Sequence, residues 1–174
     1  MTKKMRIEQP KIPTSLNPVN FQDAFYEEEP YLTDGLIANT TIENETIEKL
    51  GLSRVIFKNV TFVNCSFNRI DLTDVIFENC DLSNASFIEG IIHRVVFKEC
   101  KLIGFDLSEA NLKNVAFENC IANMSDFVEA TLKQVKFEQC SLQSANFYDS
   151  KLSVVKFEQC DINDINFTET LLKE

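Results

Sequence analysis

Large apolar residues recur at every fifth position of this chain from Leu52 to Leu172. The 25 positions 52, 57, 62 and onward to 172 hold twelve Phe, ten Leu, two Ile and one Ala. Two residues before each of them lies a second, mostly small set that includes all six cysteines. A period of five fits neither the 3.6-residue period of an α-helix nor the two-residue period of a flat strand. It fits a short extended unit in which residues i−2 and i point inward and the remaining residues turn the chain.

A longer period of twenty residues is superimposed on the first. Valine recurs two residues before phenylalanine at 55, 75, 95, 115, 135 and 155, and five cysteines recur at 80, 100, 120, 140 and 160. Four five-residue units therefore make one coil, and residue n lies over residue n+20. A single unit cannot bury its apolar pair alone, so the coils must stack into a solenoid. The rise per coil is expected to be about 4.8 Å, the distance between hydrogen-bonded strands.

Several units resemble the A(D/N)LXX signature of the pentapeptide repeat family. Examples are Cys80-Asp-Leu-Ser-Asn, Ala110-Asn-Leu-Lys-Asn and Ala130-Thr-Leu-Lys-Gln. The resemblance covers about residues 50 to 172. It implies an all-β fold, a right-handed quadrilateral β-helix of about six coils, with the i and i−2 side chains inside.

The N-terminal region is expected to differ from the repeats. All four prolines precede residue 31, and the register from Leu36 to Ile47 is imperfect because Glu45 falls on an inward position, where an unpaired charge is costly. We therefore divide the chain into an N-terminal cap with degenerate repeats, 1–50, and the β-helix, 51–174. A cap would cover the open first coil, with Phe21, Phe25 and Tyr31 as its apolar anchors.

Two neighbouring residues of the predicted core depart from the pattern of their columns. Phe105 occupies a column of otherwise smaller residues, and Leu107 occupies a column that is otherwise Phe. The two changes roughly conserve volume, so we expect the coil to accommodate them.

The residues argue against catalysis. The only histidine, His93, occupies an outward position, and the sequence has no CxxC motif and no glycine-rich phosphate loop. We expect no enzyme activity, no cofactor and no metal, and we interpret the cysteines as free buried thiols. No apolar run approaches the ~18 residues of a membrane span, and the start lacks the apolar region of a secretory signal. These patterns favour a cytoplasmic protein without membrane contact.

Surface charge is the most informative functional feature. The formal net charge is −10, which disfavours direct nucleic-acid binding and favours a partner protein with a basic surface. One predicted column carries stacked carboxylates with two more beside it, and these form the candidate partner-binding acidic strip: Glu89, Asp106, Glu109, Asp126, Glu129, Asp149 and Glu169. Neighbouring charges about 4.8 Å apart repel each other by roughly 1 kcal/mol even in water.

Two interpretations of the acidic strip stay open. A row of negative charge on a rod is similar to duplex DNA, with one phosphate per about 3.4 Å along each strand. The resemblance to the quinolone-resistance branch of the family implies DNA mimicry, binding to DNA gyrase or topoisomerase IV, and quinolone protection. Repeat duplication alone could also have copied the carboxylates. The protein would then be a structural scaffold or adaptor that binds another protein.

Two further surfaces could mediate contacts. Ile56, Ile76 and Val96, followed by Ala116, form a predicted apolar strip. It is structural if the N-terminal segment covers it, and a candidate partner site if it stays bare. The last coil presents unpaired backbone groups, so we expect a homodimer through residues near 160–174, unless acidic residues there keep the coil soluble.

Overall fold

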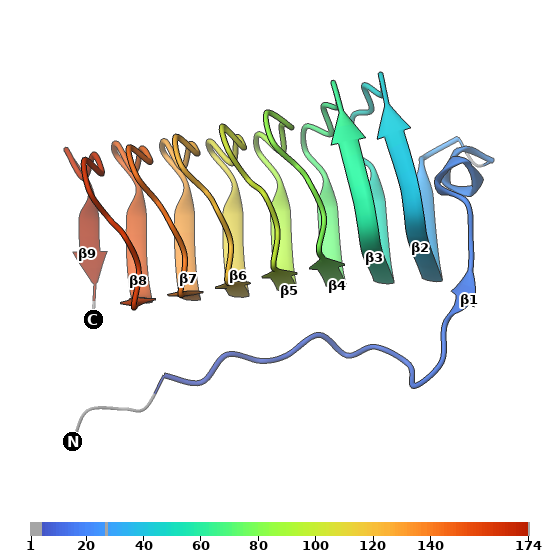
Figure 1. Ribbon diagram of the computed structural model, residues 1–174, viewed down its shortest axis with the longest axis horizontal. Helices are drawn as coiled ribbons and strands as arrows, with labels where there is room; N and C mark the ends of the chain where they lie inside the picture. Colours follow the sequence, from blue (N-terminus) through green and yellow to red (C-terminus); the bar gives the residue numbers. More distant parts are fainter. Residues whose placement is uncertain (1–4, 27, 174) are drawn as a thin grey trace.

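The five-residue units wind into a rod with one parallel sheet along it (Figure 1). The computed structural model describes residues 5–26 and 28–173. The nine strands of the sheet follow one another in sequence order. They are β1 (Asn17–Pro18), β2 (Tyr31–Glu43), β3 (Gly51–Val63), β4 (Asp71–Glu78), β5 (Ile91–Lys98), β6 (Asn111–Glu118), β7 (Thr131–Glu138), β8 (Lys151–Glu158) and β9 (Leu171–Lys173). The one helical element in the described ranges is a 3₁₀ turn, η1 (Phe21–Phe25).

The predicted vertical register of twenty residues is confirmed. Val55 pairs with Val75, and Val75 pairs with Val95, in parallel strands. The other two sides of the coil follow the same register through single bridges, such as Asp81 with Lys101 and Ser86 with Asp106. Backbone hydrogen bonds therefore link successive coils on every side, and the central side chains stack inside.

The rod has about eight turns, from β2 to β9, rather than the predicted six. Residues 31–50 form a coil in the same register, since Tyr31 pairs with Gly51 and Glu43 with Val63. Glu45 did not prevent this, because it is only half-buried and its carbonyl accepts a hydrogen bond from Ser66 N at 2.9 Å. The register is carried by backbone hydrogen bonds, which an imperfect side-chain pattern does not interrupt.

Phenylalanine rings form the core of the rod. In the column from Phe57 to Phe157, neighbouring ring centroids lie 4.6 to 5.0 Å apart and the ring planes are within 6° of parallel. This spacing matches the rise between hydrogen-bonded strands. The coil repeat therefore sets the stacking geometry of the rings.

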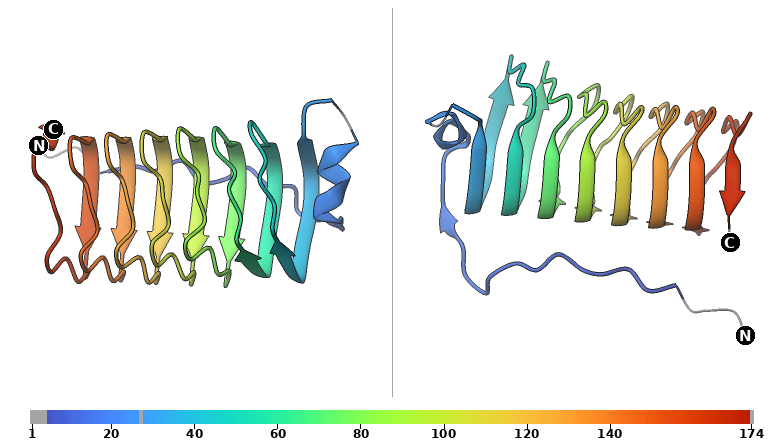
Figure 2. Two further views of the ribbon diagram at one scale, coloured as in Figure 1. Left: turned by 90° about the horizontal axis from the view of Figure 1, so that it is seen from above. Right: turned by 180° about the vertical axis from the view of Figure 1, so that it is seen from behind.

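The N-terminal segment packs against the rod in two places. At the N-terminal end, η1 buries Phe21 and Ala24, and the Phe21 ring lies 5.7 Å from that of Phe67. Phe25 and Tyr31, the other two expected anchors, are 37% and 50% exposed. Before β1, an extended arm runs back along the rod toward its C-terminal end (Figure 2). The assignment of residues 1–50 to a cap domain stays a prediction.

None of the helical segments in the described ranges has the length and apolarity needed to cross a membrane.

Candidate partner-binding surface

Each side of the coil ends at a corner residue with a positive φ angle. The corners run in steps of five from Asp34 to Glu169, and comprise 27 non-glycine residues with φ of 50° to 60° and Gly104 at 65°. Each corner lies two residues after an inward central residue. Residues with a Cβ enter this left-handed region at some cost, which Asn and Asp bear best. Corner residues are thereby aligned in straight columns along the rod.

The main column of the predicted acidic strip is one of these corner columns. It begins with Lys49 and Arg69 and continues with Glu89, Glu109, Glu129, Asp149 and Glu169, all exposed and all with φ between 52° and 59°. The column is regular because each backbone amide bonds to the next coil, as Glu109 N does to Val128 O at 2.8 Å and Glu129 N to Tyr148 O at 2.9 Å. The five carboxylate residues are therefore successive steps of one straight line, which we call the acidic ladder.

Most of the acidic ladder lacks a compensating cation. Arg69 lies 3.6 Å from carboxylate oxygens of both Glu48 and Glu89. Within the described residues, Glu109, Glu129, Asp149 and Glu169 form no ion pair. The negative charge thus accumulates over the C-terminal half of the rod.

Asp106 and Asp126 lie in a different environment from the ladder. They are half-buried register partners on adjacent coils, and Asp106 accepts a hydrogen bond from Ser108 N at 2.9 Å. Burial raises the pKa of Asp126, and the negative charge of Asp106 raises it further. The two side chains flank the ladder but are less available to a partner than its exposed members.

Another side of the coil, centred on Phe137, shows stacked charges that are compensated, because a lysine column lies beside a glutamate column. Lys136 lies 2.9 Å from Glu138 and 2.8 Å from Glu158, and Lys156 also pairs with Glu158. Hydrogen bonds from Lys136 and Lys156 lower the pKa of Glu158 to about 2. Mixed charges are thus compatible with this fold, so the repeat geometry does not by itself require the uncompensated ladder.

The predicted apolar strip is partly covered. Val96 and Ala116 are buried, whereas Ile56 and Ile76 are half-buried. Met5, Ile7 and Gln9 of the arm line one hollow together with Ala116. The arm therefore accounts for part of the strip, as expected if the strip is structural.

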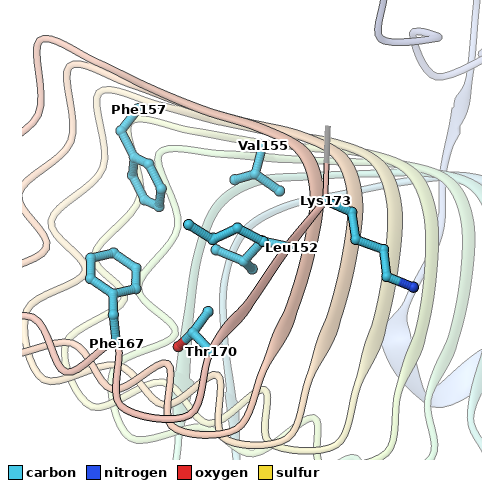
Figure 3. Close-up of a pocket in the computed structure, with 7 residues that line it drawn as sticks. Leu152, Val155, Phe157, Phe167, Thr170 and Lys173 are labelled. Carbon is cyan, nitrogen blue, oxygen red and sulfur yellow. The ribbon is translucent and has the colours of Figure 1, made fainter.

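The C-terminal end of the rod presents an open apolar hollow of about 460 Å³ (Figure 3). It is lined by Leu152, Val155, Phe157, Phe167, Thr170, Leu172 and Lys173. Phe167 and Leu172 are 40% and 77% exposed, and Ile162 and Leu171 are exposed nearby. Exposed apolar side chains therefore gather at this end of the rod.

The six cysteines are free thiols, and all but Cys160 are buried. Each thiol of the column lies close to carbonyl oxygens, as Cys100 Sγ does to Phe77 O and Lys98 O, both at 3.3 Å. Burial raises the pKa of the Cys65 thiol. No group of three or more His, Cys, Asp or Glu residues suited to holding a metal ion occurs in the part of the chain that the structure describes.

A second corner column was not singled out from the sequence. It contains Asp34, Arg54, Asp74, Arg94, Asn114 and Gln134. Arg54 pairs with Asp34 at 2.5 Å and Arg94 with Asp74 at 2.6 Å. Asp74 and Asn114 are only 5% and 2% exposed because the arm lies over them. The two ion pairs could have been predicted, because acidic and basic residues alternate at twenty-residue spacing in this column. Nothing in that pattern indicates that the arm packs over the column.

Two family models match the chain. Residues 90–167 match the pentapeptide repeat region, and residues 29–107 match the SV2A/B/C luminal domain. None of the curated proteins compared with the chain matches it.

The chain is similar to several solved structures at low sequence identity, and full-length QnrB1 shares its fold. Full-length QnrB1, a plasmid-mediated fluoroquinolone resistance protein, is 14% identical, with a TM-score of 0.52 over 80% of this chain and 94% of that one. A trypsin-treated QnrB1 variant is 15% identical over 78% of this chain and 73% of that one, with a TM-score of 0.49. The pentapeptide repeat protein Rfr23 from the cyanobacterium Cyanothece 51142 is 14% identical over 79% and 90% of the two chains, with a TM-score of 0.30.

Proposed function

We propose that this chain, which matches the pentapeptide repeat region over residues 90–167 and shares its fold with full-length QnrB1, is a non-enzymatic rod that binds a basic surface of a partner protein through its acidic ladder. The observation that carries this proposal is the run of unpaired carboxylates at Glu109, Glu129, Asp149 and Glu169. Keeping like charges about 4.8 Å apart is unfavourable, and the pairing of Lys136 and Lys156 with Glu138 and Glu158 shows that the same fold can carry compensated charges. A cationic partner would relieve the repulsion.

The partner class that fits best is a type II topoisomerase, DNA gyrase or topoisomerase IV. The ladder sets negative charges at regular intervals along a rod, as a DNA strand sets its phosphates about 3.4 Å apart. The fold is shared with QnrB1, a fluoroquinolone resistance protein. On this proposal the protein occupies the DNA-binding surface of the enzyme as a DNA mimic and protects it from quinolones. Such a partner would place the protein in the cytoplasm.

Gyrase supercoiling, with and without a quinolone, tests this function. Wild type is compared with a ladder variant, in which Glu109, Glu129 and Asp149 are all replaced by Lys. Arg69 already occupies the same corner position with a φ of 57°, so a basic side chain is compatible with the backbone there. We expect wild type to inhibit or protect at micromolar concentration and the ladder variant to do neither. Identical behaviour of the two proteins would contradict the proposal.

A scaffold or adaptor that binds some other basic protein is the second candidate. The same ladder supports it, because electrostatic complementarity specifies charge rather than the identity of the partner. An absence of any effect on gyrase, together with ladder-dependent binding to a different basic protein, would favour this candidate.

We further propose that two copies associate through the C-terminal coil. The exposed apolar side chains around the terminal hollow, including Phe167 and Leu172, support this assembly. A closed dimer would place the same surface of both copies in contact about a twofold axis.

A further inference from the structure

The N-terminal arm lies in an extended conformation along several coils and is held through its backbone. Lys11 N donates a hydrogen bond to Asp74 Oδ1 at 2.9 Å, and Glu8 N donates to Asn114 Oδ1 at 3.1 Å. Gln134 Nε2 donates to the carbonyl oxygen of Arg6 at 3.3 Å. The three side chains that bond to the arm, two as acceptors and one as a donor, belong to the single corner column described above. The rod therefore binds the arm through side chains that are aligned along its axis.

The repeat geometry explains this recognition. Asp74 and Asn114 are two coils apart, which corresponds to about 9.6 Å at the strand spacing. Lys11 and Glu8 are three residues apart, which corresponds to about 10 Å in an extended chain. An extended peptide thus brings one amide to every second corner of this column. All three bonds use backbone groups of the arm, so they select an extended conformation rather than particular side chains.

The receiving side chains are already positioned. Arg94 donates to Asp74 from Nε at 2.6 Å and from Nη2 at 2.9 Å. Burial opposes ionisation of Asp74, but the bonds from Arg94 and from the Lys11 amide outweigh it and keep the pKa of Asp74 below its usual range. Asn114 is buried as deeply. Two buried polar groups are thereby directed at the backbone of any segment that lies over this corner column. We call the surface that the arm covers there the groove.

The arm also indicates which side chains the groove accepts. Met5, Ile7, Pro10 and Ile12 are half-buried, whereas Arg6, Glu8 and Lys11 are exposed. Glu118, Glu138 and Glu158 outnumber Lys136 and Lys156 beside Met5, Ile7 and Gln9 of the arm, whereas Arg94 lies 3.8 Å from the carboxylate of Glu8. The matching ligand is an extended segment with apolar side chains at roughly alternate positions and a net positive charge.

We propose that this corner is a binding groove for an extended, basic and apolar segment of a partner protein, and that residues 5–12 are its built-in occupant. The arm closes the groove in the free protein and leaves when the partner segment enters. Its few polar contacts and the absence of any hydrogen bond from residues 12–16 to other described residues fit a displaceable occupant. The groove lies on a different corner of the rod from the acidic ladder, so the two surfaces can be tested separately.

Peptide binding to the full-length chain tests the proposal. The probe is a fluorescent peptide with the sequence of residues 5–16. An arm variant, Ile7→Asp with Ile12→Asp, weakens the built-in occupant and leaves the groove intact. A tethered occupant competes at an effective concentration in the millimolar range. We therefore expect the arm variant to bind the peptide at least about tenfold more tightly than wild type.

Two control peptides isolate the backbone recognition. Replacing Glu8 of the peptide by Pro removes the amide that Asn114 accepts, whereas replacing it by Ala keeps that amide. Loss of one such bond beside a buried acceptor should weaken binding by about fivefold or more for the Pro peptide only. Adding Asn114→Leu to the arm variant should abolish the difference between the two peptides.

The proposal is overturned if the arm variant binds the probe no better than wild type, or if the Pro and Ala peptides bind equally well. Hydrogen exchange on the wild-type chain provides a measurement that does not depend on the folding of the variants. The amides of Glu8 and Lys11 should exchange through local opening, faster than those of Val95 and Phe97 in β5. Equal protection at all four amides would make the arm a fixed part of the rod and also overturn the proposal.

Discussion

At the scale of single residues, the inward positions behave as the five-residue period predicts. Phe105, the large residue in a small column, is fully buried, with its ring 4.8 Å from that of Phe87 and 5.9 Å from that of Phe97. It occupies space next to the smaller Leu107, which is also fully buried. Close packing thus tolerates exchanges that conserve volume within one coil.

Replacing Phe117 by Ala should destabilise the protein by about 3 to 5 kcal/mol. The Phe117 ring lies 4.9 Å from Phe97 and 4.6 Å from Phe137, and backbone bonds on every coil prevent the column from collapsing. Urea unfolding provides the measurement. Ile91→Ala, at a 57% exposed position, is the control and should stay within about 0.5 kcal/mol of wild type. Equal losses in the two variants would show that Phe117 does not have the predicted core role.

Replacing Asp126 by Asn should stabilise the protein at neutral pH, because burial and the charge of Asp106 directly opposite both disfavour the ionised side chain. The expected size is about 0.2 to 1 kcal/mol, as for other cross-strand pairs. The pKa of Asp126 is raised in the folded state, so ionisation at pH 7 disfavours folding. Wild type regains this stability as the pH falls through the folded pKa, and fully below the unfolded value of about 3.9. The advantage of the Asn variant should therefore disappear in acid. Thermal melts from pH 7 to pH 3 test this, with Asp164→Asn as an exposed control.

At the scale of the repeating elements, the stacked thiols should be chemically inert. Cys80, Cys100, Cys120 and Cys140 are at most 3% exposed, whereas Cys160 is only half-buried. A thiol-reactive dye at pH 8 should label Cys160 alone in the native protein and all six cysteines after denaturation. Rapid native labelling of two or more cysteines would indicate that the coils open far more readily than the hydrogen bonding implies.

The sequence predicted the inward residues and the vertical register because both depend on apolar periodicity. It did not predict the first coil, since residues 31–50 hold their register through backbone hydrogen bonds despite Glu45. Periodicity alone was enough to align the ladder carboxylates. The sequence did not reveal the positive φ angle of the corners, because Arg, Glu, Gln and Met adopt it here as well as Asn. Nor could it place the arm, because the contacts of Lys11 and Glu8 use backbone amides and leave no side-chain pattern.

At the scale of the whole molecule, the rod has one polar corner with accumulated charge and one apolar end. A dimer through the C-terminal coil should appear in light scattering at micromolar concentration as twice the monomer mass of 19.9 kDa. The double substitution Phe167→Asp and Leu172→Asp places charges on the exposed apolar end and should give a monomer. A monomeric wild type would rule out this interface, as would a double variant that remains dimeric.

Competition with DNA for a type II topoisomerase most directly tests whether the acidic ladder is the partner-binding surface. The measurement is the fluorescence anisotropy of a labelled duplex bound to gyrase, titrated with the full chain at several salt concentrations. Wild type should displace the duplex, and displacement should weaken as salt rises, because such attraction is screened over about 8 to 10 Å at physiological ionic strength.

Two triple variants with the same change in net charge complete that measurement. The ladder variant replaces Glu109, Glu129 and Asp149 by Lys. The control replaces three exposed carboxylates outside the ladder by Lys, namely Glu43, Glu99 and Asp164. We expect the ladder variant no longer to displace the duplex and the control still to do so. A partner-binding role of the ladder is contradicted if wild type leaves the duplex bound, or if the two triple variants lose displacement equally.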